Sequence, residues 1–284
     1  MVKKAHLVTG KGGVGKSLFS AALASALSLE NKPILLTELN EVSFYREYLD
    51  LPDLGYKPLP YKTNLDVAQW APDDCLKEYA LHLLKIESLY KLFFENPVTK
   101  SLIQIAPGLH ELALMGKLTS SPRRHGPAMP YDQIVADAFA TGHFLALMRS
   151  AGGLNEAIKF GPMGEQTKSI DTYLRNSEFT QIHIVTLAEE LPITETIEQA
   201  FLLKNEFGLQ AQIYLNKIVN LDEAEIAQAP SVLQAPMNDI LTNQQNARNK
   251  LSAAGLQFQE LPFVFKTRAE DLIQTLQEHL RGHV

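Results

Sequence analysis

One eight-residue segment near the N-terminus constrains this chain more than any other feature. Residues 10–17 read Gly-Lys-Gly-Gly-Val-Gly-Lys-Ser, which fits the phosphate-binding pattern G-x-x-x-x-G-K-[ST]. Glycines allow backbone N–H groups to turn inward around phosphate oxygens, and the positive end of a following helix adds to the attraction. We therefore expect a nucleotide's phosphates to be bound by Gly12, Gly13, Val14, Gly15, Lys16 and Ser17.

The last two residues of this loop also predict a metal ion. In loops of this kind the lysine reaches the β- and γ-phosphates and the hydroxyl ligates Mg²⁺, which gives Lys16 a catalytic role and makes Ser17 a metal ligand. A buried strand is predicted at 5–9 and a helix at 16–29, the strand–loop–helix context that the motif requires. The expected ligands are therefore ATP and Mg²⁺.

Apolar strands alternate with helical stretches along most of the chain. Further strands are predicted at 33–39, 64–70, 134–137, 181–187, 211–216 and 257–264. A helix is predicted at 195–207, closed by Gly208. Strands that are apolar throughout belong to parallel sheets covered on both faces. We therefore expect an α/β fold, a doubly wound and mostly parallel sheet, with 1–284 as a single P-loop domain.

One region interrupts the alternation. Residues 76–94 are helical and strongly apolar with a narrow polar stripe, Pro97 ends this stretch, and 98–118 continue in the same style. We expect residues from about 71 to 130 to form a helical insertion within the sheet domain. The wide apolar face of 76–94 is compatible with a client-binding groove, a dimer contact or a place in the core.

Charge and cysteine content exclude several classes of function. The chain has 26 basic and 32 acidic side chains, so the basic excess typical of nucleic-acid binders is absent. Its one cysteine, Cys75, excludes an intramolecular disulfide framework and a thiolate-rich zinc site. No apolar run approaches the roughly 18 residues of a membrane span, and the first residues do not resemble a signal peptide. We expect a cytoplasmic protein with no nucleic-acid partner and at most indirect membrane contact.

The lysine at the start of the loop carries further information. With Lys11 and Lys16 at its two ends, the loop resembles the deviant Walker A motif of the Min-type and partition ATPases, nitrogenase iron protein and the arsenical-pump family. In that group the extra lysine contacts phosphate across a dimer interface. The resemblance implies a homodimer in which Lys11 has a catalytic role in the partner subunit's site. The alternative is a solvated loop lysine.

A second motif selects one branch of that group. Residues 137–148 read Asp-Ala-Phe-Ala-Thr-Gly-His-Phe-Leu-Ala-Leu-Met. They are similar to the D-[TA]-x-P-T-G-H-x-L-R-L-L switch of the ArsA-like arsenical-pump and tail-anchored-protein targeting ATPases. The resemblance implies that Asp137 is catalytic and holds Mg²⁺, that Gly142 donates its N–H to the γ-phosphate, and that His143 reports nucleotide state to the helical region.

Three weaker matches follow in the order of that family. Residues 106–112 resemble its P-G-x-x-E-L segment, and residues 185–196 resemble its V-T-x-P-E-x-x-x-x-E-T segment. Asn216 matches a position whose side-chain amide pairs with the adenine edge, since an amide offers both a donor and an acceptor. The alternative for Asn216 is a turn residue at a strand end.

The chain also departs from the family pattern. The first switch of the family reads S-T-D-P-A-H, whereas residues 37–42 read Thr-Glu-Leu-Asn-Glu-Val. Asn40 then takes the place of the water-orienting aspartate, so catalysis by Asn40 is expected to be slow, or Glu38 or Glu41 serves instead. The targeting ATPases' C-x-x-C zinc clasp and the pump's several cysteines are absent from the sequence.

These observations favour a homodimeric ATPase that hydrolyses Mg·ATP and acts as a nucleotide-driven conformational switch on a protein client. One alternative is a Min- or partition-type positioning ATPase, although the acidic residues of the last helix oppose binding to anionic lipid. An arsenite-pump ATPase needs about three thiolates for a soft metalloid. A small-molecule kinase uses a loop with a single lysine, so Lys11 argues against that class.

Overall fold

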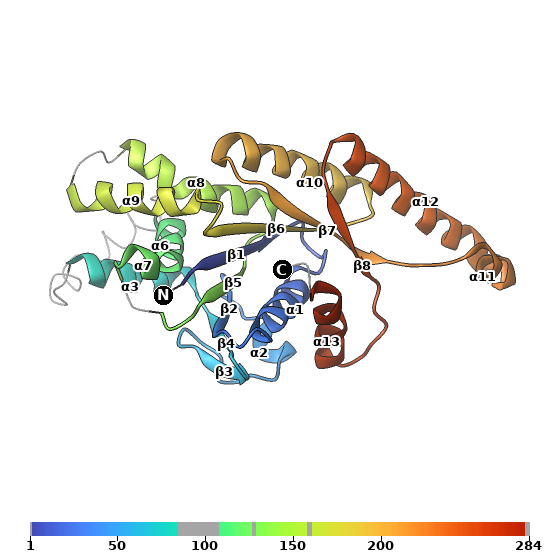
Figure 1. Cartoon of the computed structure of the whole chain (residues 1–284), viewed down its shortest axis with the longest axis horizontal. Coiled ribbons are helices and arrows are strands. Elements are labelled where there is room, and N and C mark those ends of the chain that lie inside the picture. The colour runs from blue at the N-terminus through green and yellow to red at the C-terminus, as the bar shows by residue number, and fades with distance from the viewer. Residues whose placement is uncertain (1, 85–107, 127–128, 158–160, 282–284) are drawn as a thin grey trace.

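The computed structural model describes residues 2–84, 108–126, 129–157 and 161–281. These residues contain an eight-stranded sheet in the order β3-β4-β2-β5-β1-β6-β7-β8 (Figure 1). Neighbouring strands are parallel, except that β3 and β4 are antiparallel. The strands are β1 (Lys4–Thr9), β2 (Ile34–Glu38), β3 (Leu59–Lys62), β4 (Leu65–Gln69), β5 (Gln133–Asp137), β6 (Thr180–Leu187), β7 (Ala211–Ile218) and β8 (Phe258–Pro262). The predicted α/β fold with a mostly parallel sheet is confirmed.

Helices lie on both sides of this sheet (Figure 1). One side carries α1 (Lys16–Ser28), α2 (Tyr45–Tyr48) and α13 (Ala269–Leu280). The other side carries α3 (Pro72–Leu84), α6 (Leu109–Leu118), α8 (Thr141–Ala157), α9 (Gly161–Leu174), α10 (Glu190–Leu202) and α12 (Ser231–Ala253). Three short elements remain: α7 (Ser120–Arg123), the π-helical turn η1 (Leu203–Phe207) and α11 (Glu223–Gln228).

Successive apolar residues of the central strands point to opposite faces, so each face has its own core. On β1, Leu7 belongs to the core beneath α6 and α8, whereas Val8 belongs to the core beneath α1 and α13. On β2, Leu35 and Leu36 divide in the same way. This division explains why these strands are apolar throughout, which is the pattern that predicts a doubly wound sheet.

The predicted strands agree with the structure to within about two residues at each end, but one helix boundary and one strand differ more. The helix predicted at 195–207 begins at Glu190 and ends in the π-helical turn, although Gly208 closes it in the left-handed conformation as expected, with φ 72°. The predicted start at residue 195 was wrong, because the helix already includes Pro192. Proline is tolerated there because backbone N–H groups in the first turn of a helix have no intrahelical acceptor. Strand β3 was not predicted, since it has four residues and includes Pro60.

The helices between β4 and β5 pack against one another. Helix α3 contacts α6, and α6 also contacts α8 and α9. Cys75 and Leu76 of α3 are buried in the same core as Leu112 and Leu118 of α6, and Ala80 of α3 is also buried. The first part of the apolar stretch 76–94 is therefore core, while residues 85–107 and 127–128, including Phe93 and Phe94, lie outside the described residues.

A charged side chain also joins these helices. Lys117 on α6 donates to Glu78 Oε2 on α3 and to the Tyr56 hydroxyl, each at 2.7 Å. Its ammonium group also lies 4.0 Å from the centre of the Tyr56 ring. Because the Lys117 side chain is only 10% exposed, loss of either partner would leave a poorly solvated charge.

The C-terminal helix α13 packs against α1. Its apolar residues Ile273, Leu276 and Leu280 are buried in the core on that side of the sheet. An amphipathic tail available for a membrane surface would need this face, so its burial removes support from the positioning alternative. Among the residues that the structure describes, no helix combines the length and apolar character needed to cross a membrane.

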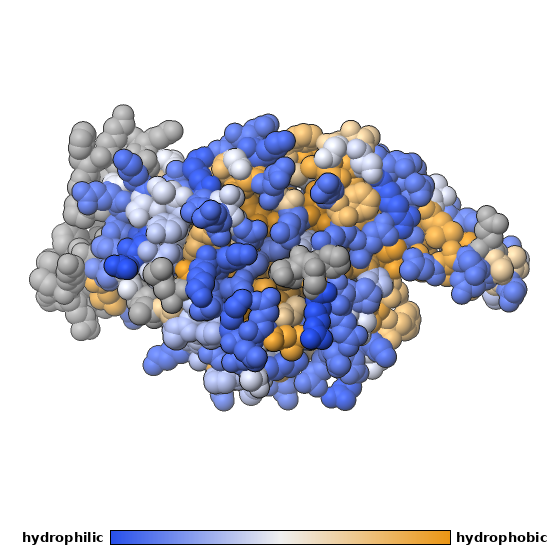
Figure 2. Space-filling model, viewed as in Figure 1, coloured by the Kyte–Doolittle hydropathy of each residue, from blue (hydrophilic) through white to orange (hydrophobic). Residues whose placement is uncertain are grey.

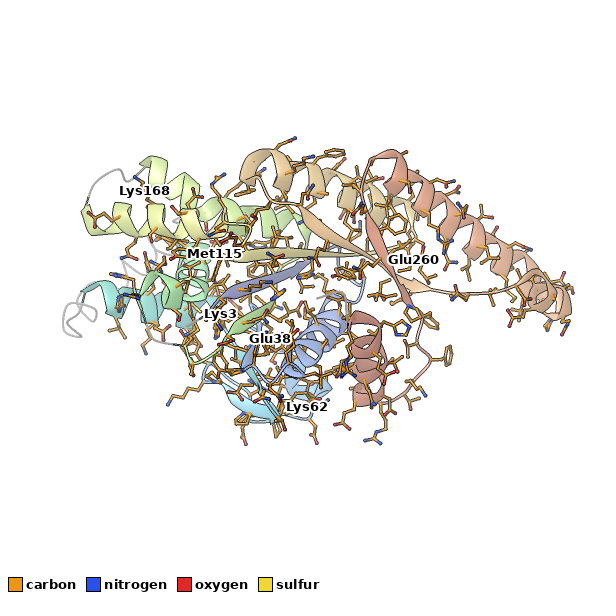
Figure 3. All side chains as sticks on the ribbon, viewed as in Figure 1. Lys3, Glu38, Lys62, Met115, Lys168 and Glu260 are labelled. Atoms are coloured by element: carbon orange, nitrogen blue, oxygen red, sulfur yellow. The ribbon has the colours of Figure 1, made fainter. Side chains whose placement is uncertain are left out.

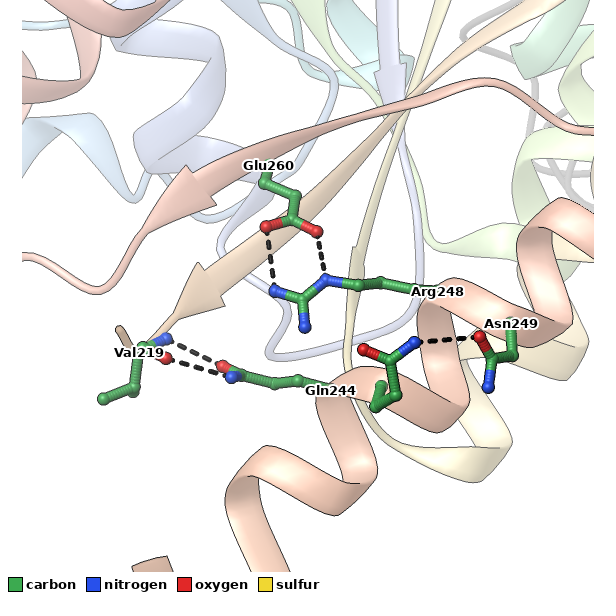
Figure 4. A network of polar contacts seen from close by, with 6 residues as sticks. Val219, Gln244, Arg248, Asn249 and Glu260 are labelled. Atoms are coloured by element: carbon green, nitrogen blue, oxygen red, sulfur yellow. Dashed lines mark hydrogen bonds and ion pairs between the residues drawn. The ribbon is translucent and has the colours of Figure 1, made fainter. Parts of the chain in front are cut away.

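Helix α12 is fixed to the sheet through its second half (Figure 4). Gln244 donates to Val219 O at 3.0 Å and accepts from Val219 N at 2.7 Å, and Arg248 forms a two-point ion pair with Glu260 of β8. The first half projects from the body (Figure 1) and carries the exposed side chains of Val232, Leu233 and Ile240, which add to the apolar surface of this arm (Figure 2).

A chain of polar side chains crosses the buried sheet face beneath α1. His6 on β1 lies between Gln133 on β5, at 2.8 Å from Nε2, and His183 on β6, at 2.9 Å from Nδ1. His183 Nδ1 is in turn 3.3 Å from the Tyr214 hydroxyl on β7. Burial lowers the pKa of His6 to about 4 and holds the pKa of His183 well below its ordinary value. Both imidazoles are therefore neutral in the folded chain.

The two buried, neutral histidines predict that the free energy of unfolding decreases in acid. The unfolded histidines bind protons below their ordinary pKa of about 6.5, whereas the folded ones do not, so the free energy of unfolding falls as the pH drops from about 6.5 towards 4. We expect a loss of about 2 kcal/mol for His6 between pH 7 and pH 5, measured by urea unfolding. His6→Gln should flatten this dependence, whereas His279→Gln on the exposed side of α13 should not. Equal slopes in all three proteins would contradict the assignment.

Candidate functional site

The loop at residues 10–17 joins β1 to α1 at the carboxyl edge of the sheet. Gly10, Gly13 and Gly15 have φ values of 142°, 85° and 98°, which strongly favour glycine. A Cβ added to Gly10 would lie 2.1 Å from Val185 O, so this end is held against β6. At Gly12 and Gly13 no described atom lies within 4 Å of an added Cβ. The loop is thus anchored at its start and open in the middle, as a phosphate cradle requires.

Lys16 begins α1 and lies back over the loop. Its Nζ donates to Lys11 O at 3.0 Å, which spans the cradle. Burial lowers the pKa of Lys16, and the charge of Asp137 acts in the opposite direction. A phosphate in the cradle would offer this ammonium group a charged acceptor in place of a carbonyl, which is a stronger hydrogen bond.

Asp137 ends β5 beside the loop and is 2% exposed. Burial raises its pKa to about 6, while a hydrogen bond from Ser17 and the charge of Lys16 act to lower it. Tyr45 fixes this corner, because its hydroxyl donates to Ser17 O at 2.9 Å and lies 3.5 Å from Asp137 Oδ2. The other carboxylate oxygen, Oδ1, is buried and has no hydrogen-bond partner within the described residues.

This donor set fits a magnesium ion. The Ser17 hydroxyl and the Asp137 carboxylate are hard oxygen ligands, and a divalent cation would satisfy the unpartnered Oδ1. Such an ion would also lower the pKa of Asp137, since an adjacent positive charge favours the carboxylate. The structure therefore brings together three residues that the sequence assigned to one site: Lys16, Ser17 and Asp137.

Glu38 lies beside Asp137 on the neighbouring strand, and its charge adds to the burial that raises the pKa of Asp137. It pairs in register with Asp137 across β2 and β5, is 0% exposed, and lies within the body of the molecule (Figure 3). Its carboxylate accepts hydrogen bonds from the Ser43 hydroxyl and from Phe44 N–H, the latter at 2.8 Å. Burial raises the pKa of Glu38. Glu38 therefore holds the turn after β2 in place.

Asn40 and Glu41 lie farther along that turn. Gln69 donates to both of their carbonyl oxygens, at 3.0 and 2.7 Å, and Leu39 N–H donates to Asp137 O at 3.2 Å. Asn40 and Glu41 line a cleft of about 720 Å³ together with Phe139, which follows Asp137 by two residues. The turn is thus tied to β5 and β4 while its polar side chains line the cleft.

The same cleft reaches the helices between β4 and β5. Phe139 and His143, from the segment after β5, line it together with Asp73 of α3 and Glu111 of α6. The Phe139 and His143 rings stack with their centres 4.8 Å apart, and His143 Nε2 lies 3.6 Å from Glu111 Oε1. His143 is therefore placed between the segment that follows Asp137 and helix α6.

Gly142 lies in the first turn of α8 and is exposed. Backbone N–H groups in the first turn of a helix have no intrahelical acceptor, so this one is available to an anion. Asn216 is 5% exposed and contacts the loop from below: its Nδ2 donates to Val14 O at 2.9 Å, and its Oδ1 accepts from Lys217 N at 2.9 Å. The adenine contact proposed for Asn216 stays a prediction.

Lys11 has a partner that sequence reasoning missed. Its Nζ lies 2.7 Å from Oε1 of Glu195 on α10, and the other oxygen of Glu195 accepts from the Thr141 hydroxyl at 3.1 Å. The Lys11 side chain is 31% exposed. Glu195 lies within the segment 185–196 that resembles the family, but its partner is 184 residues away, and no local pattern predicts such a pair.

The strand–loop–helix cradle, with Lys16 and Ser17 at its end and Asp137 on the neighbouring strand, defines a P-loop nucleotide-binding protein. Residues 3–161 match the family model of the ArsA ATPases, described as anion-transporting ATPase. This match covers more than half of the chain, so the chain belongs to the ArsA ATPase family. The resemblance found in the two sequence motifs is confirmed.

Relatives named as ATPases match different lengths of the chain. ATPase BagA of Mycobacterium tuberculosis (strain ATCC 25618 / H37Rv) is 32% identical over 201 residues, 68% of this chain and 58% of that protein. The arsenical pump-driving ATPase of Acidiphilium multivorum is 24% identical over 291 residues, 96% of this chain and 49% of that protein. The ATPase ASNA1 homolog of Cryptosporidium parvum is 33% identical over 149 residues, 50% and 36% of the two chains. The chain therefore spans only part of the length of these relatives.

Proposed function

We propose that this chain binds Mg·ATP at residues 10–17, hydrolyses it as a homodimer, and acts as a nucleotide-driven switch on a protein client. The observation that carries the proposal is that Lys16, Ser17 and Asp137 lie together. Within the described residues, Asp137 Oδ1 is buried and accepts no hydrogen bond. Membership of the ArsA ATPase family supports it. The cytoplasm is the proposed location, which a single buried cysteine favours.

Each residue of the site has a proposed role. Bound Mg·ATP supplies a γ-phosphoryl group whose charge the metal partly neutralises. The backbone N–H groups of residues 12–15 hold the phosphates, and Lys16 exchanges Lys11 O for a phosphate oxygen. Ser17 and Asp137 hold the metal ion, and Gly142 N–H donates to the γ-phosphate.

The turn after β2 has the role of positioning water. Asn40 orients the attacking water through hydrogen bonds, because its amide cannot take up a proton, and turnover is accordingly slow. Glu38 is already engaged by Ser43 and Phe44, so it supports the turn and does not take part in proton transfer. At the other end of the nucleotide, Asn216 retains one N–H and one lone pair for the adenine edge.

Residues that line the cleft couple nucleotide binding to the proposed client-binding helices. A γ-phosphate bound at Gly142 would displace the first turn of α8, and with it His143, which stands 3.6 Å from Glu111 on α6. Helix α6 packs against α3, the start of the apolar stretch that we propose as the client-binding or dimer-binding element. Nucleotide state is thereby coupled to the helices between β4 and β5.

Two other functions lose support. A metalloid pump needs thiolate ligands, but burial raises the pKa of Cys75 to about 12, so this thiol stays protonated at neutral pH. A positioning ATPase that uses a membrane-binding tail needs a free amphipathic helix, whereas the apolar face of α13 is buried against α1.

Mixing two inactive variants tests the homodimer and the role of Lys11. Lys11→Ala and Asp137→Asn should each lose ATPase activity. If Lys11 acts in the partner's site, each mixed dimer has one intact site, and an equimolar mixture should recover about a quarter of wild-type activity. Mixed dimers are confirmed by co-purification through two different tags. No recovery in confirmed mixed dimers would contradict action across the interface.

A further inference from the structure

Glu195 of α10 contacts two separate parts of the nucleotide site through its two carboxylate oxygens. One carboxylate oxygen holds Lys11 Nζ at 2.7 Å, and the other accepts from Thr141 at 3.1 Å. Lys11 belongs to the phosphate-binding loop, and Thr141 is the first residue of α8, directly before Gly142. Hydrogen bonds from Lys11 and Thr141 lower the pKa of Glu195, so the carboxylate is charged at neutral pH.

Helix α10 holds this carboxylate in a fixed place. Ile193 and Thr196, on either side of Glu195, are buried, and α10 packs against β6 and α12. A second contact lies one turn farther on, where Gln199 Nε2 is 3.5 Å from the Thr9 hydroxyl, which itself donates to Phe139 O at 2.9 Å. Helix α10 is therefore connected to the segment after β5 at two points.

We propose that Glu195 is a positioning residue that holds Lys11 on its own subunit until ATP binds. This inference rests on the proposed function, because it takes Lys11 to act in the partner's site. A γ-phosphate at the start of α8 competes with Glu195 for the Thr141 hydroxyl, and its negative charge repels the Glu195 carboxylate, which weakens the hold of Glu195 on Lys11. Loss of both contacts releases the lysine towards a second subunit, which makes dimerisation dependent on ATP.

The chemical reactivity of the Lys11 amine tests the contact itself. An acetylating reagent is applied to the nucleotide-free protein, and modification of Lys11 is followed by mass spectrometry. Glu195→Gln should raise the rate for Lys11 by about 3- to 10-fold, as expected for loss of a partly exposed ion pair. Mg with a non-hydrolysable ATP analogue should raise the wild-type rate at protein concentrations below those that form dimers.

A matched control lies on the same helix. Glu190 also pairs with a lysine, Lys250 at 3.3 Å, but its side chain is 88% exposed and this pair involves no residue of the loop. Glu190→Gln should leave the reactivity of Lys11 unchanged. Thr141→Val, which keeps the charge of Glu195 and removes only the hydroxyl, should give a smaller increase than Glu195→Gln.

The dependence of ATPase activity on protein concentration tests the consequence. Glu195→Gln should lower the concentration of half-maximal activity by about 3- to 10-fold, because Lys11 is already released. Unchanged Lys11 reactivity in Glu195→Gln would overturn the hold by Glu195. Raised reactivity with an unchanged half-maximal concentration would overturn its control of dimerisation. Failure of the mixing experiment bears instead on the role of Lys11 across the interface, so the two failures are distinguishable.

Discussion

Lys16→Ala should reduce kcat/KM for ATP by at least about 10²- to 10³-fold, the cost of removing one preorganised donor from a developing charge. Lys16 begins α1 and already spans the cradle to Lys11 O at 3.0 Å, so its ammonium group is positioned before nucleotide arrives. The loss should appear in both turnover and affinity, because the lysine contacts phosphate in the bound state as well as in the transition state. Phosphate release and calorimetry measure the two effects.

A surface lysine provides the control for this substitution. Lys62 on β3 is exposed and lies away from the loop (Figure 3), so Lys62→Ala removes the same charge without touching the cradle. It should retain wild-type kinetics. Wild-type turnover in Lys16→Ala would rule out residues 10–17 as the ATP site.

Alanine substitutions at two glycines of the loop should affect different properties, Gly10→Ala the free energy of unfolding and Gly12→Ala the affinity for nucleotide. Gly10→Ala places a Cβ 2.1 Å from Val185 O at a φ of 142°, so either the loop or β6 must move. The overlap with backbone and the strained φ together predict a loss of about 2–5 kcal/mol in the free energy of unfolding. Urea denaturation measures this loss.

Gly12→Ala is the matched substitution. No described atom lies within 4 Å of its added Cβ, so the free energy of unfolding should change by less than about 1 kcal/mol. The methyl group would instead project from the open part of the cradle and weaken nucleotide binding. If Gly12→Ala were as destabilised as Gly10→Ala, or bound ATP as tightly as wild type, the geometry of the cradle described above would be wrong.

The core of the site could be predicted because its residues are tied to local patterns. Gly10 to Ser17 follow an apolar strand, and Asp137 ends another. Carboxyl ends of parallel strands meet at one edge of the sheet, so two strand-end motifs far apart in sequence reach one place. The strand assignments predict that the lysine, the hydroxyl and the carboxylate share one edge, and the resemblance to the family's switch selects Asp137 as the carboxylate.

The rest of the site depends on contacts that no local pattern encodes. Residues 38–41 contain Glu38, Asn40 and Glu41, and the sequence left open which of them serves the site. Their surroundings differ only in three dimensions: Glu38 is enclosed by its own turn, whereas Asn40 and Glu41 line the cleft. The pairing of Lys11 with Glu195 likewise depends on how α10 packs across the sheet, so it is visible only in three dimensions.

Calorimetric titration of the wild-type chain with ATP, in the presence and absence of Mg²⁺, tests the central claim most directly. Because Lys16, Ser17 and Asp137 form one site on each chain, we expect one ATP bound per chain, with affinity that falls at least about tenfold when Mg²⁺ is withheld. Asp137→Asn should lose this dependence on Mg²⁺. Saturable binding of equal affinity with and without Mg²⁺, or no binding by the wild-type chain, would contradict a magnesium-dependent ATP site at these three residues.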